Sequence, residues 1–234
     1  MKERIDKIFA KASILTRSEC AIAIKKKRIT LNGEIVTSPS IKADSKSDSI
    51  LLDGKVCDLK EYVYIMLNKP SGVVSASTDG KDKTVIDILP KEMLRKGLFP
   101  AGRLDKDTLG LVIITNDGVS AHKRLSPKHH AEKVYLFTVI EDVLDEDVKK
   151  IEQGVVLKDG YKTAPCKVEM LTKTQGYITL TEGKYHEIKR IFGSLGNKIT
   201  FLKRVSFAGI MLDENLSYGQ ARYLTDEEEA LFTK

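Results

Sequence analysis

The chain has 234 residues, of which 41% are hydrophobic, so it is long enough for one or two domains with a sizeable core. No stretch approaches the roughly 18 to 20 apolar residues of a membrane span, and the first residues lack the apolar segment of a secretion signal, so we expect a cytoplasmic protein that does not enter a membrane. The three cysteines are widely spaced and the four histidines lack recognisable ligand spacing, which argues against a disulfide framework, a zinc module and a catalytic metal.

The net charge of +6 is distributed unevenly along the chain. Residues 1–60 carry 13 Lys/Arg and 8 Asp/Glu, whereas residues 61–234 carry 26 and 25. This distribution is typical of a nucleic-acid-binding appendage on a nearly neutral body. A solvated basic face with no partner would have the same composition, so charge alone leaves both interpretations open.

Residues 1–58 are expected to form a small domain of helices followed by short strands. Ile5, Ile8 and Phe9 share one helical face, and the sequence from Thr16 to Glu19 fits a capping box that opens a second helix. That helix ends in four consecutive cations at 25–28, which suit the negative end of a helix. Asn32-Gly33 and Asp53-Gly54 then follow short apolar runs, as turns of β-hairpins do.

After a short linker at 59–62, residues 63–234 are expected to form a second domain. Strands are predicted at 63–67, 111–115, 134–140, 167–171 and 177–181. Helices are predicted at 83–89, 118–125, 146–154 and 187–195, with a capped terminal helix from residue 226. Strands flanked by a few helices predict an α+β fold with a mostly antiparallel mixed sheet.

Two motifs about 80 residues apart carry the chemistry. The first is a tight loop at 102–110 that contains Asp105 and leads into the apolar run 111–115; the second is the basic cluster Lys184–Arg190. An Asp beside a fixed cation stays ionised at neutral pH and can act as a nucleophile or a base. A loop Asp also commonly caps a helix or satisfies turn amides, so Asp105 alone would not identify a site.

Together these motifs resemble the signature of pseudouridine synthases, in particular the RsuA-type family that modifies ribosomal RNA. The resemblance implies that Asp105 is the essential carboxylate, while Asp107, two residues further on, has no catalytic role. It also implies that the Lys-Pro turn after the first strand, at residues 66–73, has a mainly structural part in shaping the active-site cleft.

Further site residues follow from the same resemblance. Tyr135 matches the tyrosine that stacks on the target base, and Leu202 matches the apolar residue beneath that base, although each could equally be a packing residue. Lys189 matches the basic residue that pairs with the catalytic Asp, with Arg190 as the alternative. Glu187 stands where a Gln is expected and adds a carboxylate to the pocket. Four cations are expected to contact RNA around this site: Arg103, Lys133, Lys184 and Arg190.

The N-terminal region resembles the small RNA-binding domain of a small-subunit ribosomal protein. In that domain two helices present basic residues to RNA, which here implies a role for Arg4, Arg17, Lys25, Lys26, Lys27 and Arg28.

The implied activity is isomerisation of a uridine to pseudouridine in ribosomal RNA without a cofactor, by a monomer. The short acidic C-terminal end favours 16S rRNA or an assembling small subunit over 23S rRNA, whose enzymes often carry longer basic tails. The alternatives are an enzyme for 23S rRNA and a non-catalytic ribosome-associated RNA-binding factor. The sequence does not decide whether Asp105 attacks the ribose or removes a proton from it.

Overall fold

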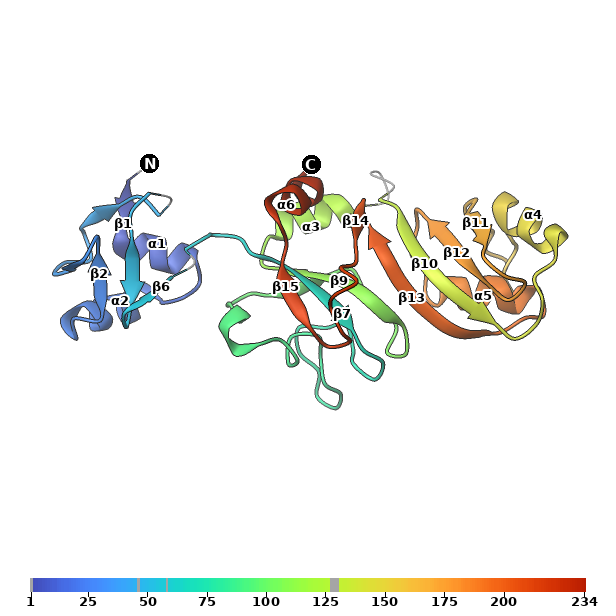
Figure 1. Cartoon of the computed structure of the whole chain (residues 1–234), viewed down its shortest axis with the longest axis horizontal. Coiled ribbons are helices and arrows are strands. Elements are labelled where there is room, and N and C mark those ends of the chain that lie inside the picture. Colours follow the sequence, from blue (N-terminus) through green and yellow to red (C-terminus); the bar gives the residue numbers. More distant parts are fainter. Residues whose placement is uncertain (1, 46, 58, 127–130) are drawn as a thin grey trace. The chain divides into compact units, whose positions relative to one another are not determined.

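The structure is a computed structural model that describes residues 2–45, 47–57, 59–126 and 131–234 (Figure 1). It divides into two compact units, Met1–Val63 together with Met93–Leu98, and Tyr64–Glu92 together with Phe99–Lys234. The sequence predicts one uninterrupted domain from residue 63 onward, whereas the segment 93–98 groups with the first unit. Lys96 of this segment lines the same groove as Ala10 and Arg17.

The N-terminal unit is built on two short helices, α1 (Ile5–Lys11) and α2 (Arg17–Lys25). Ile5, Ile8 and Phe9 are buried against α2, as their spacing predicts. The predicted capping box is present, because Thr16 Oγ1 accepts the Glu19 N–H at 3.2 Å and Glu19 Oε2 accepts the Thr16 N–H at 2.7 Å. This reciprocal pair fixes where α2 begins.

Short strands complete this unit. The strands are β1 (Glu3–Arg4), β2 (Ile29–Leu31), β3 (Glu34–Ile35), β4 (Lys42–Ala43), β5 (Ile50–Leu52) and β6 (Lys55–Val56). Four of them form a sheet in the order β3-β2-β5-β6, and β1 pairs with β4. Both predicted hairpin turns form: Asn32 and Gly33 have φ of 51° and 89°, and Asp53 and Gly54 have φ of 54° and 75°. Two successive positive φ angles are what a tight hairpin turn requires.

The second unit is organised by a nine-stranded sheet. The strands are β7 (Tyr64–Lys69), β8 (Phe99–Ala101), β9 (Leu109–Thr115), β10 (Lys133–Val139), β11 (Lys167–Met170), β12 (Gln175–Leu180), β13 (Ile199–Phe207), β14 (Ile210–Met211) and β15 (Ala221–Tyr223). The main path runs β11-β12-β10-β13-β9-β7-β15, with β14 beside β13 and β8 beside β9. All of these strand pairs are antiparallel except β9 with β13, so the predicted α+β fold with a mostly antiparallel sheet is confirmed.

Four helices cover the two halves of this sheet: α3 (Gly118–Leu125), α4 (Asp145–Gln153), α5 (Glu187–Ser194) and α6 (Asp226–Thr233). Helices α3 and α6 lie against the β7–β9–β15 half, and α4 and α5 against the β10–β13 half (Figure 1). Each half has its own apolar core. The predicted cap of the terminal helix is present, because Thr225 Oγ1 accepts the Glu228 N–H at 3.3 Å.

The two halves meet where β9 runs parallel to β13, at Gly110 beside Arg204. Gly110 has a φ of 98°, and a Cβ at this position would overlap with the backbone carbonyl of Arg204. The glycine is therefore needed both for its backbone conformation and for the close approach of the two strands. The loop that contains Asp105 ends at this junction, so the junction positions the candidate site.

One prediction for this unit is wrong, and one long strand is not predicted. Residues 83–89 form turns instead of a helix, because Asp87 Oδ2 accepts both the N–H and the hydroxyl of Thr84, and Pro90 leaves no room for further turns of helix. The strand β13 is the longest in the fold, yet the sequence does not predict it. Its apolar pattern is broken by Lys203 and by Arg204, a buried cation whose Nε donates to the Leu111 carbonyl at 2.7 Å.

Within the ranges that the structure describes, no helix combines the length and the apolar character that crossing a membrane would require.

Candidate active site

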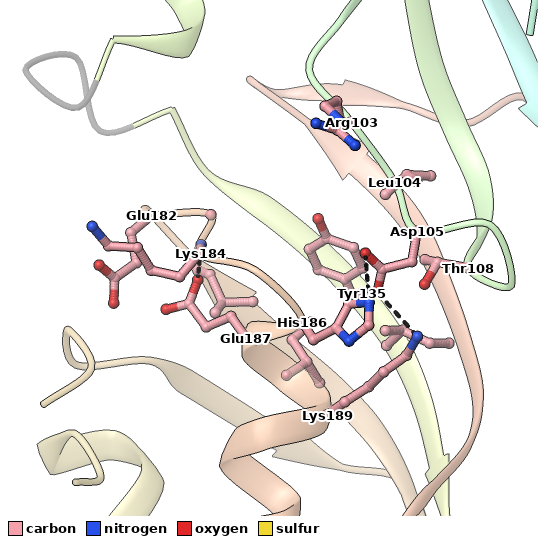
Figure 2. Close-up of a pocket in the computed structure, with 14 residues that line it drawn as sticks. Arg103, Leu104, Asp105, Thr108, Tyr135, Glu182, Lys184, His186, Glu187 and Lys189 are labelled. Atoms are coloured by element: carbon pink, nitrogen blue, oxygen red, sulfur yellow. Dashed lines mark hydrogen bonds and ion pairs between the residues drawn. The ribbon is translucent and has the colours of Figure 1, made fainter. Parts of the chain in front are cut away.

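A pocket opens beside the junction of β9 and β13 (Figure 2). The loop between β8 and β9 contributes Asp105, strands β10 and β13 contribute Tyr135 and Leu202, and the start of α5 contributes Lys189. The structure therefore brings together all four of the residues that the sequence assigns to the reaction and to the base. They come from segments up to 97 positions apart in the chain.

Asp105 is held between two basic side chains. Lys189 Nζ donates to Asp105 Oδ2 at 3.0 Å, and His186 Nε2 lies 3.6 Å from Asp105 Oδ1. About a quarter of each side chain of the Asp105–Lys189 pair is exposed, so the pair is partly dry but open to a ligand. A carboxylate in this setting is available for attack or for proton removal.

Lys189 is shared with a second carboxylate. Its Nζ donates to Asp107 Oδ1 at 2.6 Å, which is closer than its contact with Asp105, but the Asp107 side chain is 69% exposed. Burial lowers the pKa of Lys189, yet the hydrogen bonds to Asp107 and Asp105 outweigh burial and raise it above its ordinary value. Burial raises the pKa of Asp107, but the hydrogen bond and the charge of Lys189 together lower it by more. The pKa of Asp107 therefore lies below its ordinary value. Lys189 therefore remains a cation at neutral pH.

The loop that contains Asp105 is supported from beneath by Lys69 at the end of β7. Lys69 is fully buried, and its Nζ donates to the carbonyls of Pro70, Lys106 and Thr108 at 3.1, 3.1 and 2.8 Å. Burial lowers the pKa of Lys69 to about 8, and the nearby carboxylate of Asp107 limits the fall. Two of these carbonyls, those of Lys106 and Thr108, follow Asp105 in sequence, so a buried ammonium fixes the backbone on its C-terminal side.

A serine fixes the same loop at its start. Ser75 Oγ accepts the Leu104 N–H at 3.0 Å and donates to the Leu104 carbonyl at 3.1 Å. Sequence reasoning does not identify Ser75, because a single serine in a loop carries no motif. It assigns Lys69 only a general structural part, although the Lys-Pro turn marks its position.

Apolar side chains form one wall of the pocket. Tyr135 is partly buried on β10, and Leu202, which is 8% exposed, lies on the neighbouring strand β13. Ile188 and Leu180 complete this wall. Tyr135 and Asp105 line the same pocket (Figure 2), so a flat heterocycle that enters it meets both the ring and the carboxylate.

The cations expected to contact RNA around the pocket differ in their surroundings. Arg103 and Lys184 are exposed and line the pocket. Lys133 is partly buried, and its Nζ donates to the Ala131 and Thr181 carbonyls at 2.9 and 3.4 Å, so its charge is turned toward the protein. Arg190 forms an ion pair with Asp159 and does not reach Asp105, which makes Lys189 the partner of that carboxylate.

Two glutamates line the pocket on the side away from Asp105. Glu187 is 5% exposed and its Oε2 accepts the Lys184 N–H at 2.8 Å. Burial, followed by the neighbouring Glu182, raises the pKa of Glu187 to about 7. Sequence reasoning identifies Glu187 as an added carboxylate but does not identify Glu182 as its partner.

The basic residues of the N-terminal unit fall into two groups. Arg4 and Arg28 are engaged in ion pairs with Asp6 and Asp53. Four others are exposed and form no ion pair with any residue that the structure describes: Arg17, Lys25, Lys26 and Lys27. These four present free positive charge at the two ends of α2.

Comparison with known proteins identifies both units. The family model for RNA pseudouridylate synthases matches residues 63–194, and the model for the S4 domain matches residues 3–50. The chain belongs to the RNA pseudouridine synthase family. It is therefore an isomerase of RNA uridine with an S4 domain at its N-terminal end, as the two motifs and the basic N-terminal region predict.

Relatives resemble the chain over nearly its whole length. The "Uncharacterized RNA pseudouridine synthase YtzG" of Bacillus subtilis is 39% identical, covering 96% of each chain. The "Ribosomal small subunit pseudouridine synthase A" of Escherichia coli K12 is 38% identical, covering 97% of this chain and 98% of the relative. A crystal structure of a pseudouridylate synthase superimposes with a TM-score of 0.70 at 37% identity, covering 98% and 99% of the two chains. These likenesses confirm the RsuA type of the family.

Proposed function

We propose that the chain converts a uridine of 16S ribosomal RNA to pseudouridine, with Asp105 as its catalytic carboxylate. The observation that carries the proposal is the Asp105–Lys189 pair, with 3.0 Å between the carboxylate oxygen and Nζ, at the mouth of a pocket walled by Tyr135 and Leu202. The preference for 16S RNA is supported by the named activity of relatives from E. coli and Haemophilus influenzae.

The proposed reaction begins with binding. The exposed cations around α2 neutralise RNA phosphates, which gives affinity with little sequence choice. One uridine then leaves its stack, at a cost of a few kcal/mol, and its base lies between Tyr135 and Leu202. The stacking energy recovered on the aromatic ring, about 1–3 kcal/mol, offsets much of that cost.

The chemical step breaks the bond between ribose C1′ and N1 of the base. Asp105 either attacks C1′ or removes a ribose proton, and the hydrogen bond from Lys189 orients the carboxylate for both routes. The base turns in the pocket, C5 bonds to C1′, the C5 hydrogen leaves as a proton and N1 gains one. Substrate and product are isomers, so no co-substrate is consumed.

Tritium release from RNA labelled at uridine C5 tests the proposal, because isomerisation must expel that hydrogen. We expect release from a 16S transcript or a small-subunit assembly particle, and little from 23S RNA. Equal release from both RNAs would refute the 16S preference.

A matched pair of variants tests the catalytic residue. Asp105→Asn is expected to abolish release while RNA binding persists, because the amide cannot act as nucleophile or base. Asp107→Asn makes the same change two positions further on and is expected to keep most of the activity. If Asp105→Asn retained activity, the assignment of Asp105 would be wrong.

A further inference from the structure

The two glutamates at the pocket wall fasten the loop between β12 and α5. Glu182 Oε1 accepts the Ala164 N–H at 2.7 Å, and Glu182 Oε2 accepts the Tyr161 hydroxyl at 2.6 Å. Glu187 Oε2 accepts the Lys184 N–H at 2.8 Å. The pair therefore anchors both the start and the middle of the 182–187 loop.

Glu187 is poorly placed to carry a negative charge. Its Oε1 is buried and has no hydrogen-bond partner among the described residues, and no cation there lies within ion-pairing distance of its carboxyl group. Figure 2 shows this carboxyl group turned toward that of Glu182 and away from Asp105. An ionised carboxylate buried with one neutral donor is costly, whereas a protonated one can donate to its neighbour.

The charged and titratable groups around Glu187 do not remove this cost. Lys133 on β10 spends its donors on backbone carbonyls, and the ammonium of Lys184 lies 5.0 Å from the ring centre of Tyr161. Tyr161 donates to Glu182, and burial raises the pKa of the Cys166 thiol to about 12, so both stay neutral. Protonation is then the remaining way to neutralise Glu187, in agreement with its raised pKa.

His186, the residue directly before Glu187, links the glutamate pair to Asp105. His186 has a φ of 49° and a ψ of 34°, a left-handed conformation that a non-glycine residue keeps only where its surroundings fix it. It places the imidazole 3.6 Å from Asp105, and the first turn of α5 that follows carries Lys189. Two adjacent negative charges at Glu182 and Glu187 would repel each other and release this arrangement.

We propose that one proton, shared by Glu182 and Glu187 and located on Glu187, holds the 182–187 loop so that His186 and Lys189 meet Asp105. Glu187 is thus a positioning residue of the reaction, and the inference rests on the proposed role of Asp105. The Gln expected at this position would hold the loop at any pH, so the Glu makes positioning depend on pH.

The test compares wild type with Glu187→Gln, in which the amide keeps the shape and the donor of the neutral acid. The measured quantity is kcat/KM for tritium release, which reports ionisations of the free enzyme, between pH 6 and 9. The ratio of variant to wild type is expected to be near one at pH 6 and to rise about tenfold per pH unit above pH 7. A ratio that stays flat would overturn the proposal.

Two further variants define the comparison. Glu187→Ala, which loses the bond to the Lys184 N–H as well as the proton, is expected to be weak throughout the range. Glu169→Gln, which neutralises an exposed glutamate on β11, is expected to follow the wild-type profile.

Thermal unfolding tests the shared proton without relying on the proposed 16S substrate. Since the folded-state pKa of Glu187 lies above its unfolded value, the folded state binds more protons between about pH 4.5 and 7. The wild type is therefore expected to lose stability relative to Glu187→Gln over that window and to change no further above it. If no enzyme releases tritium from 16S RNA, the substrate proposal fails, while parallel unfolding curves would still overturn the proton-sharing pair.

Discussion

Replacing Lys69 by Met tests whether a buried ammonium supports the catalytic loop. The ammonium reaches three backbone carbonyls, yet burial shifts its pKa from the ordinary 10.5 to about 8. That shift corresponds to about 3 kcal/mol in favour of the neutral amine in the folded state. Between pH 8 and 10.5 the unfolded chain therefore binds more protons at this residue than the folded chain does.

The sign of the expected effect follows from this difference in bound protons. Stability rises with pH wherever the unfolded state binds more protons, by about 1.4 kcal/mol per pH unit for a single group. The free energy of unfolding of wild type, relative to Lys69→Met, should be constant below pH 8. It should then rise by about 2–3 kcal/mol by pH 10.

Urea unfolding followed by far-ultraviolet circular dichroism at pH 7, 8, 9 and 10 measures this difference. Lys149→Met, which removes an exposed lysine from α4, serves as the control and is expected to run parallel to wild type. If the Lys69→Met curve also ran parallel to wild type, the reasoning from burial would be refuted.

Three further predictions concern the strand junction, the base and the RNA-binding unit. Gly110→Ala should destabilise the protein by about 3 kcal/mol or more in thermal unfolding, because the added Cβ overlaps with Arg204 and the residue has a positive φ. Gly118→Ala is the control and should be nearly neutral, because there is open space around that position. Tyr135→Phe should keep the stacking platform for the base, while Tyr135→Leu should lose about 1–3 kcal/mol of transition-state stabilisation in kcat/KM, and equal loss in both would contradict stacking. Changing Lys25, Lys26 and Lys27 together to Gln should reduce the slope of log K for RNA binding against log salt concentration by up to about 2, because each phosphate contact with single-stranded RNA contributes about 0.7. An unchanged slope would mean that these lysines do not contact the RNA.

Much of the fold could be predicted from local patterns. The capping boxes at Thr16 and Thr225 and the Asn-Gly turn at 32–33 act within a few residues, so the sequence shows them directly. The strand β13 was not predicted because a cation, Arg204, interrupts its apolar pattern. The burial of Arg204 depends on a hydrogen bond to the Leu111 carbonyl, 93 positions away, which local patterns do not show. The segment 83–89 has the residues of a helix start, but its Thr84–Asp87 contacts close a turn before Pro90.

Candidate site residues could be predicted where they lie in a family motif. The residues that hold the site in place through contacts between distant segments could not. Asp105, Tyr135 and Lys189 lie in motifs that single them out in the sequence, and the structure places all three at one pocket. Ser75, Glu182 and the exact contacts of Lys69 depend on which backbone groups the fold brings near them. Asp107 shows the limit of motif matching, because it binds Lys189 more closely than Asp105 does without being the matched residue.

The parallel pairing of β9 with β13 has a consequence for synthesis. The pocket needs β13, which ends at Phe207, and the sheet edge beside β7 needs β15, which ends at Tyr223. A growing chain therefore holds Asp105 long before it holds Lys189 or the strand beside Gly110. Such non-local pairing forms late and slowly. A chain that stops before residue 199 holds Asp105 but lacks β13, so we expect it to be inactive and not merely weakened.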